Sequence, residues 1–262
     1  MSYPAPHARA PFDDRGTSAF LLVRLATILA SAALLSLATP ARAQNAVDGP
    51  VTELAIRLVS APLDTFTTAR EAFIAALVEQ DGVGTDREFV AILDGRTFEP
   101  PAAATYVGMT QYGDAASFAE AGEALAAGSE AQAFFGTFTP LVFTALRPLD
   151  AADAYDLAGI ADQPGQVLEI AVRDLSTFAD FDTTDYDARR LAFLDVLSSM
   201  PGVVDEYQWV SILDPNIVVG MTVYESAEAF ESLAGDAALL EVAMPFLQKY
   251  PAFAGYIVVD AR

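Results

Sequence analysis

The sequence contains no cysteine and a single histidine, His7, which lies close to the first residue. A chain without cysteine forms no disulfides and offers no thiolate for metal binding or nucleophilic attack. If residues 1–43 are removed by processing, the remaining chain also has no histidine. Zinc sites of the usual kind, haem held by histidine or cysteine, and Ser-His-Asp triads are then excluded. We therefore predict no metal site and no cofactor.

Basic residues are also scarce. The 262-residue chain has 14 Lys and Arg against 36 Asp and Glu, and its formal net charge is −22. Residues 44–262 hold 10 of the basic and 34 of the acidic residues, a balance of −24. A surface this acidic repels nucleic acid and anionic membranes. We expect neither of them as a partner.

The N-terminal segment has the features of a leader. Arg24 precedes an apolar run over residues 25–37, and Ala41-Arg42-Ala43 is a small-x-small cleavage pattern. The run is shorter than the roughly 20 residues that span a membrane. This arrangement is typical of a secretory signal peptide, which we predict over residues 1–43. The alternative is an N-terminal membrane anchor that is not cleaved. We predict a periplasmic or secreted protein that is free of the membrane after cleavage.

Three short motifs occur twice in the chain, in the same order. ELAIR at 53–57 returns as EIAVR at 169–173, VAILD at 90–94 as VSILD at 210–214, and VGMTQY at 107–112 as VGMTVY at 219–224. The two copies of each motif are 112 to 120 residues apart. Units of that length are too long for a solenoid repeat and long enough for small domains. We predict a first unit over 44–150, a linker over 151–165 and a second unit over 166–262.

Each unit shows the order β-α-β-β-α-β. Alternating apolar residues predict strands, and apolar residues at helical spacing predict helices. The expected strands are 53–58, 87–93, 105–112 and 141–146, then 167–172, 206–213, 217–224 and 256–259. The expected helices are 66–79, 114–127 and 130–135, then 186–199, 227–233 and 238–247.

This order is ferredoxin-like, and its helices cover one face of the sheet and leave the other bare. Two units can cover each other, sheet against sheet. The predicted fold class is α+β, with two tandem ferredoxin-like units that form a single-chain pseudo-dimeric α+β barrel. We expect a monomer, because the chain supplies both halves of the dimer.

Two repeated polar pairs are candidate ligand-binding residues: Glu53 with Arg57, and Glu169 with Arg173. Residues four apart in a strand share a face. If the intervening apolar residues pack on the helices, the polar pairs point into the barrel and orient the oxygen atoms of a ligand. The alternatives are a structural Glu–Arg lattice or an exposed edge strand.

Aromatic residues recur at matching positions of the strands. Phe89, Tyr207 and Trp209 lie on the second strands of the two units, and Tyr112 and Tyr224 end the third strands. Together they could line an aromatic pocket. The alternative is an ordinary barrel core.

Pro201-Gly202 and the run GMTVYESAEAF at 220–230 resemble the antibiotic-biosynthesis-monooxygenase-like superfamily of dimeric α+β barrels. The shared features are a strand that ends in an aromatic residue and a helix that starts with Ser-x-Glu-Ala or a similar pattern. A weaker copy stands at 112–118, so the resemblance covers both repeats. Family members often have Trp where Tyr112 and Tyr224 stand, and often carry a histidine in the following helix, which is absent here. The resemblance therefore implies the fold, and it transfers neither oxygenation nor haem degradation.

The function predicted from these observations is that of a metal-free protein that binds a small apolar or aromatic molecule inside the barrel. One alternative is a cofactor-independent monooxygenase-like enzyme for an aromatic or polyketide-like substrate. The other is a structural or partner-binding module. The volume of the barrel interior separates them, because a barrel filled by Phe, Met and Trp leaves no room for a ligand.

Overall fold

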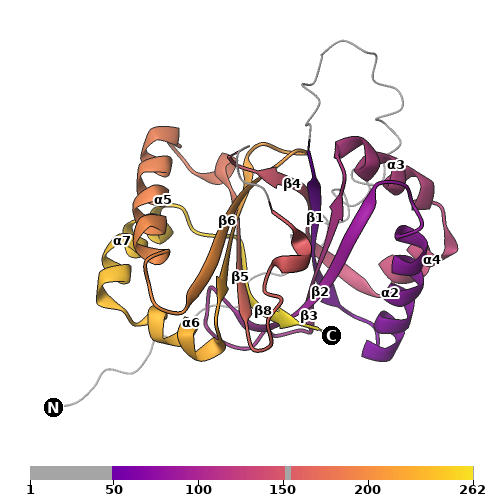
Figure 1. The fold of residues 1–262 in the computed structure, drawn as a ribbon, viewed down its shortest axis with the longest axis horizontal. Coiled ribbons are helices and arrows are strands. Elements are labelled where there is room, and N and C mark those ends of the chain that lie inside the picture. Colours follow the sequence, from indigo (N-terminus) through magenta and orange to yellow (C-terminus); the bar gives the residue numbers. More distant parts are fainter. Residues whose placement is uncertain (1–48, 151–154, 262) are drawn as a thin grey trace, which may run out of the picture. The chain divides into compact units, whose positions relative to one another are not determined.

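The structure is a computed structural model that describes residues 49–150 and 155–261. The predicted signal peptide, residues 1–43, and the start of the predicted linker, 151–154, lie outside these residues. The elements fall into two repeats of the same order (Figure 1). The first repeat contains β1 (Val51–Val59), α2 (Leu63–Leu77), β2 (Val83–Asp94), β3 (Thr105–Tyr112), α3 (Ala115–Leu125), α4 (Ser129–Phe135) and β4 (Phe138–Pro148). The second contains β5 (Val167–Asp174), α5 (Thr183–Leu197), β6 (Val203–Ser211), β7 (Ile217–Tyr224), α6 (Ala227–Ala234), α7 (Ala237–Lys249) and β8 (Ala254–Asp260).

The eight strands form a closed antiparallel barrel in the order β1-β3-β2-β8-β5-β7-β6-β4. Each repeat supplies four neighbouring strands, and the two sets are joined where β2 pairs with β8 and β4 pairs with β6. Both junctions join the second strand of one repeat to the last strand of the other, so the repeats are related as the halves of a dimer. The predicted pseudo-dimeric α+β barrel is confirmed.

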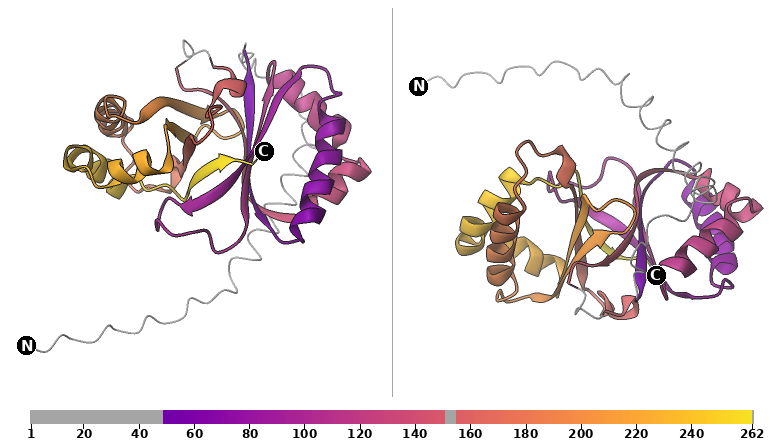
Figure 2. Two further views of the ribbon diagram at one scale, coloured as in Figure 1. Left: turned by 60° about the horizontal axis from the view of Figure 1, so that its bottom comes forward. Right: turned by 90° about the horizontal axis from the view of Figure 1, so that it is seen from above.

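The helices lie on the outside of the barrel. Figures 1 and 2 show α2, α3 and α4 against the outer face of one sheet, and α5, α6 and α7 against the outer face of the other. Polar side chains fix where several helices begin: Asp114 starts α3, Asp182 starts α5 and Ser226 starts α6, each accepting a hydrogen bond from a backbone N–H of the first turn. Such caps satisfy N–H groups that lack an intrahelical partner.

The barrel interior is filled with apolar side chains. Leu54 and Ile56 of β1 and their counterparts Ile170 and Val172 of β5 are fully buried there. The same cluster contains the large residues Phe89, Met109, Met221 and Trp209. Protein interiors are packed like crystals of small molecules, so the barrel offers no room for a ligand. The prediction that a ligand is held inside the barrel is wrong.

The connection between the repeats closes this interior. Leu157 and Ile160, on either side of the short 3₁₀ helix η1 (Leu157–Gly159), belong to the barrel core and are fully buried. Arg87 of β2 donates hydrogen bonds to the carbonyls of residues 157, 158, 160 and 161 and to Asp260 of β8. The buried guanidinium of Arg87 thus joins the connecting segment to the barrel strands through hydrogen bonds.

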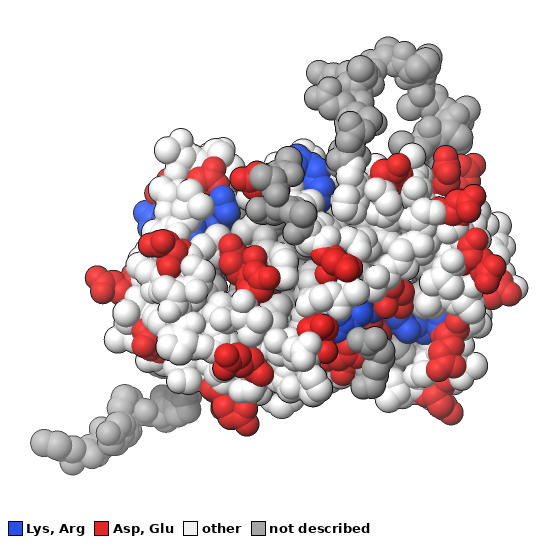
Figure 3. All heavy atoms as spheres, in the orientation of Figure 1, with Lys and Arg blue, Asp and Glu red and all other residues white. Residues whose placement is uncertain are grey.

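The acidic character of the chain is visible on its surface. Figure 3 shows many Asp and Glu side chains spread over one face and only a few places where Lys or Arg is exposed. Among the described residues, no helix is both long and apolar enough to cross a membrane.

Candidate functional site

The polar pairs of β1 and β5 lie between the sheets and the helices. Leu54 and Ile56 face the barrel core, and because side chains alternate along a strand, Glu53 and Arg57 face α2 and α4. Glu169 and Arg173 take the same orientation under α5 and α7. The expectation that these pairs point into the barrel is wrong. Arg57 and Arg173 are nevertheless buried, at 5% and 6% exposure.

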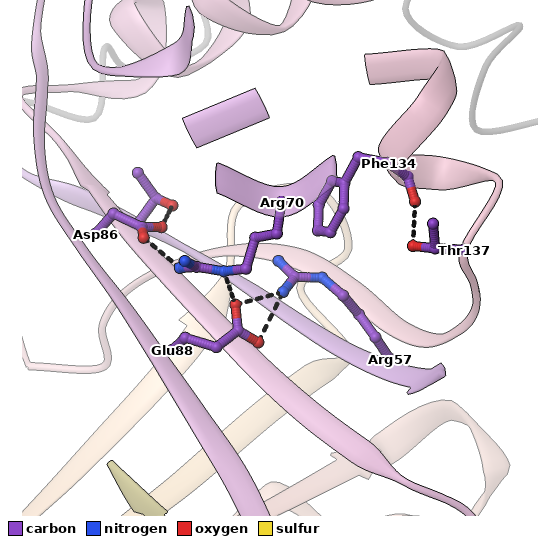
Figure 4. A network of polar contacts seen from close by, with 7 residues as sticks. Arg57, Arg70, Asp86, Glu88, Phe134 and Thr137 are labelled. Carbon is purple, nitrogen blue, oxygen red and sulfur yellow. Dashed lines mark hydrogen bonds and ion pairs between the residues drawn. The ribbon is translucent and has the colours of Figure 1, made fainter. Parts of the chain in front are cut away.

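In the first repeat, the space between sheet and helices is closed by an ion-pair network (Figure 4). Arg57 Nη1 donates to both carboxylate oxygens of Glu88, at 3.1 and 3.0 Å. Arg70 of α2 reaches the same carboxylate through Nε and pairs with Asp86 through Nη2. Each buried guanidinium therefore meets at least one carboxylate, as burial of charge requires.

Aromatic side chains and a glycine complete this packing. The Arg57 guanidinium lies 5.1 Å from the ring centre of Phe134 and 5.6 Å from that of Phe138. On its other side is Gly108 of β3, where an added Cβ would lie 2.2 Å from Arg57 Nη2. Only a residue without a side chain leaves room for the guanidinium at this place.

In the second repeat, the corresponding arginine is oriented differently. Arg173 Nε donates to the carbonyl of Tyr250 at 2.8 Å, and the guanidinium lies 4.7 Å from the ring centre of Phe246 on α7. Gly220, the counterpart of Gly108, has the Gln208 amide rather than an arginine above it, at 3.2 Å from an added Cβ. The guanidinium of Arg173 therefore packs against α7 and not over the glycine of the neighbouring strand.

A cavity of about 60 Å³ remains in the second repeat, between the sheet and helices α5 and α7. Its walls include Glu169, Ala171 and Arg173 of β5, with Gly220 of β7 and Phe246 of α7. Next to it, an open groove of about 810 Å³ lies between α5, β6 and the end of β4. Both spaces are lined by Arg190, Leu194 and Gln208, which therefore stand between an inner cavity and an outer groove.

Each repeat also pairs a buried glutamate with a tyrosine. The Tyr112 hydroxyl donates to Glu53 at 3.0 Å, and the Tyr224 hydroxyl donates to Glu169 at 2.6 Å. Burial raises the pKa of Glu169, against the opposing effects of the Tyr224 hydroxyl and Arg173. Burial likewise raises the pKa of Glu53. A carboxyl with a raised pKa at the wall of a cavity is suited to bind or transfer a proton.

The aromatic residues proposed from the sequence do not come together. Phe89 and Trp209 lie in the barrel core, and Tyr207 packs at its margin while its hydroxyl donates to Asp205. Tyr112 and Tyr224 lie on the opposite face of the sheet, under the helices. The predicted aromatic pocket is therefore wrong, because it joined residues from both faces of one sheet.

Sequence reasoning missed Arg190 and Gln208, which lie at the centre of the site. A usable signal was present: Val90 of the first repeat returns as Val210, an offset of 120 residues. The same offset aligns Arg70 with Arg190 and Glu88 with Gln208. The one change from glutamate to glutamine marks where the second repeat departs from the closed arrangement of the first.

The raised pKa of Glu169 leads to a prediction for stability. Because the folded-state pKa exceeds the unfolded value, the contribution of Glu169 to stability is present at low pH and lost as pH rises through the folded pKa. Glu169→Gln keeps a hydrogen-bond partner for Tyr224 and removes this loss. The free energy of unfolding of the variant, minus that of the parent chain, should therefore be larger at pH 8 than at pH 4. Urea unfolding at the two pH values measures this difference. Glu231→Gln, on the exposed face of α6, supplies the baseline, and an equal difference at both pH values would contradict the assignment.

Comparison with known proteins supports the fold. No protein-family model and no curated protein matches the sequence. A solved structure from Fusobacterium nucleatum, provisionally named a monooxygenase, has a TM-score of 0.51 at 11% identity and covers 82% of this chain and 93% of its own. An anthrone oxidase-like protein has a TM-score of 0.51 at 13% identity, with coverage of 81% and 92%. A chlorite dismutase from Candidatus Nitrospira defluvii has a TM-score of 0.52 at 12% identity, with coverage of 82% and 92%. These neighbours are dimeric α+β barrel proteins, and at such identities the similarity shows the fold alone.

Proposed function

We propose that this protein binds a small molecule between the sheet and the helices of its second repeat. The observation that carries the proposal is the inner cavity and outer groove on either side of Arg190, Leu194 and Gln208. Among the described residues, two other places that were candidates for a ligand are filled by side chains. The barrel holds a packed apolar core, and the ion-pair network with its aromatic cover fills the corresponding space of the first repeat.

The lining residues do not fit a haem. None of the side chains that line the inner cavity or the outer groove is His, Cys or Met, the usual axial ligands. We propose binding that needs no prosthetic group.

A cofactor-independent oxygenase-like reaction is the second candidate. Glu169 lines the inner cavity and burial raises its pKa, so it is suited to take a proton from a bound substrate at neutral pH. Two of the structural neighbours bear the names of a monooxygenase and an anthrone oxidase-like protein. Such a reaction requires that the substrate first binds in the cavity.

Ala171 offers a direct test, because its side chain lines the inner cavity and its counterpart Ala55 lies in the closed first repeat. Ala171→Leu fills the cavity and should raise stability by about 0.5–2 kcal/mol. Ala55→Leu overpacks its site and should cost about 1–3 kcal/mol. Ligand-observed NMR with a set of neutral and charged aromatic fragments should detect ligands that Ala171→Leu no longer binds and that Ala55→Leu still binds. Unchanged binding by Ala171→Leu, or no fragment bound by the parent chain, would contradict the proposal.

A further inference from the structure

The two repeats place two arginines at matching positions but surround them with different acids. Arg57 and Arg70 of the first repeat share the carboxylate of Glu88. Their counterparts in the second repeat are Arg173 and Arg190, and the position of Glu88 is taken by Gln208, which is uncharged. The second repeat thus keeps the buried cations and lacks the carboxylate that joins them in the first.

Some hydrogen-bond donors of Arg173 have no partner among the described residues. Its Nε is bound to the Tyr250 carbonyl, but neither Nη1 nor Nη2 has a hydrogen-bond partner among the described residues. The side chain is 6% exposed and lines the inner cavity. A guanidinium carries five donors in a planar fork, and those on Nη1 and Nη2 are left for a partner from outside the chain. The free donors face a space that can hold their partner.

Arg190 is in a similar position on the other side of the cavity. Its Nη2 donates to Asp187 Oδ1 at 3.2 Å, whereas its Nε is buried and has no partner among the described residues. Its side chain is 12% exposed. Arg70, the corresponding residue of the first repeat, uses the same two nitrogens to bind two carboxylates.

Two glutamates near the cavity accept hydrogen bonds within the protein. Glu169 accepts the Tyr224 hydroxyl at 2.6 Å, and Glu206 accepts the Gln208 amide at 2.9 Å. The free donors of Arg173 and Arg190 consequently favour an anion in the cavity.

We propose that the ligand of this site is an organic acid with one carboxylate, which enters the inner cavity and binds Arg173 and Arg190. This inference rests on the proposed function and adds the chemical class of the ligand. A carboxylate matches the planar donor fork of arginine. A cavity of about 60 Å³ exceeds the roughly 10–15 Å³ that one water needs, and so has room for this group.

The outer groove determines the chemical character of the part of the ligand that lies outside the inner cavity. Leu149, Leu191 and Leu194 give it apolar walls, and Asp195 and Glu206 add negative charge. Apolar walls suit a hydrocarbon or aromatic body, and acidic side chains repel a second carboxylate. The geometry therefore selects monocarboxylic over dicarboxylic acids.

Benzoate and its neutral analogue benzamide test the charge of the ligand. In calorimetric titrations of the folded chain, benzoate should bind at least tenfold more tightly than benzamide, and phthalate, a dicarboxylate, should bind more weakly than benzoate. Equal affinity for benzoate and benzamide would overturn the inference.

A variant at position 208 tests the location. Gln208→Glu restores the acid of the first repeat and should reduce benzoate affinity at least tenfold. Circular dichroism and urea unfolding of Gln208→Glu check that the variant is folded, so that the loss of affinity reports the added charge. The control is Glu231→Gln on the exposed face of α6, which should leave benzoate affinity unchanged. Benzoate binding that survives Gln208→Glu would overturn the inference.

The outcomes also separate this inference from the proposed function. If benzamide binds as well as benzoate and Ala171→Leu abolishes both, the pocket stands and the acid preference is wrong. If neither compound nor any other fragment binds in a way that Ala171→Leu abolishes, both proposals are wrong.

Discussion

Replacement of Arg87 by methionine should lower the free energy of unfolding by about 3–5 kcal/mol. Arg87 is 2% exposed and donates to four carbonyls of residues 157–161 and to Asp260 at 2.5 Å. Methionine fills similar space but donates no hydrogen bond, so the carbonyls lose a shared donor. Since Leu157 and Ile160 belong to the barrel core, release of this segment would also expose apolar surface. Urea unfolding followed by circular dichroism measures the change.

Tyr207 stands at the position of Arg87 in the second repeat and provides the control. Its hydroxyl donates to Asp205, an exposed contact, so Tyr207→Phe should cost no more than about 1 kcal/mol. A loss below about 1 kcal/mol for Arg87→Met would show that the segment is held by its apolar residues alone.

Replacement of Glu88 by leucine should also be severe, with an expected loss of about 3–5 kcal/mol. Glu88 is 6% exposed and is the carboxylate shared by Arg57 and Arg70. Arg70 keeps Asp86, but Arg57 would be left with its ring contacts to Phe134 and Phe138. Removal of one partner leaves a buried charge without compensation, and this accounts for the size of the effect.

The matching change in the second repeat should be mild. Gln208 donates to Glu206 at 2.9 Å and to the Tyr207 carbonyl at 3.1 Å, and it carries no charge. Gln208→Leu should therefore cost about 1 kcal/mol. Comparable losses for the two leucine variants in urea unfolding would contradict the assignment of a closed network to the first repeat alone.

The sequence predicted the architecture because the signals for it were local and repeated. Every strand and helix of both repeats lies within a few residues of its predicted range. Alternating residues identify a strand, and the β-α-β-β-α-β order leaves few ways to arrange four strands and their helices. The repeat then supplies the second half of the barrel.

The orientation of β1 and β5 could not be obtained in this way. Alternation shows that Leu54 and Arg57 lie on different faces, but both faces of these sheets are buried. Arg57 is accommodated under the helices by a distant glycine, Gly108, and by aromatic rings from α4 and β4. These contacts depend on packing between elements far apart in the chain, and no local pattern reports them.

Strand patterns in the sequence could not predict that the barrel is filled. A pattern assigns residues to the interior but does not measure the volume that they occupy. Part of that volume is taken by Leu157 and Ile160, from a segment whose polar, Gly- and Pro-containing sequence resembled a solvated linker. Their burial follows from the hydrogen bonds of Arg87, which join positions about 70 residues apart.

The two repeats differ in what surrounds their buried arginines. The same strand residues support a closed network in one repeat and an arginine-lined cavity in the other, and the change from Glu88 to Gln208 separates them. In the account proposed above, the first repeat stabilises the barrel and the second repeat binds the ligand.

A crystal structure of the protein with 4-bromobenzoate tests this account most directly, because the bromine is located by its anomalous scattering. The account predicts one bromine site in the outer groove of the second repeat, with the carboxylate within hydrogen-bond distance of Arg173 and Arg190. A bromine site inside the barrel or between the sheet and helices of the first repeat, or none at a saturating concentration, would contradict it.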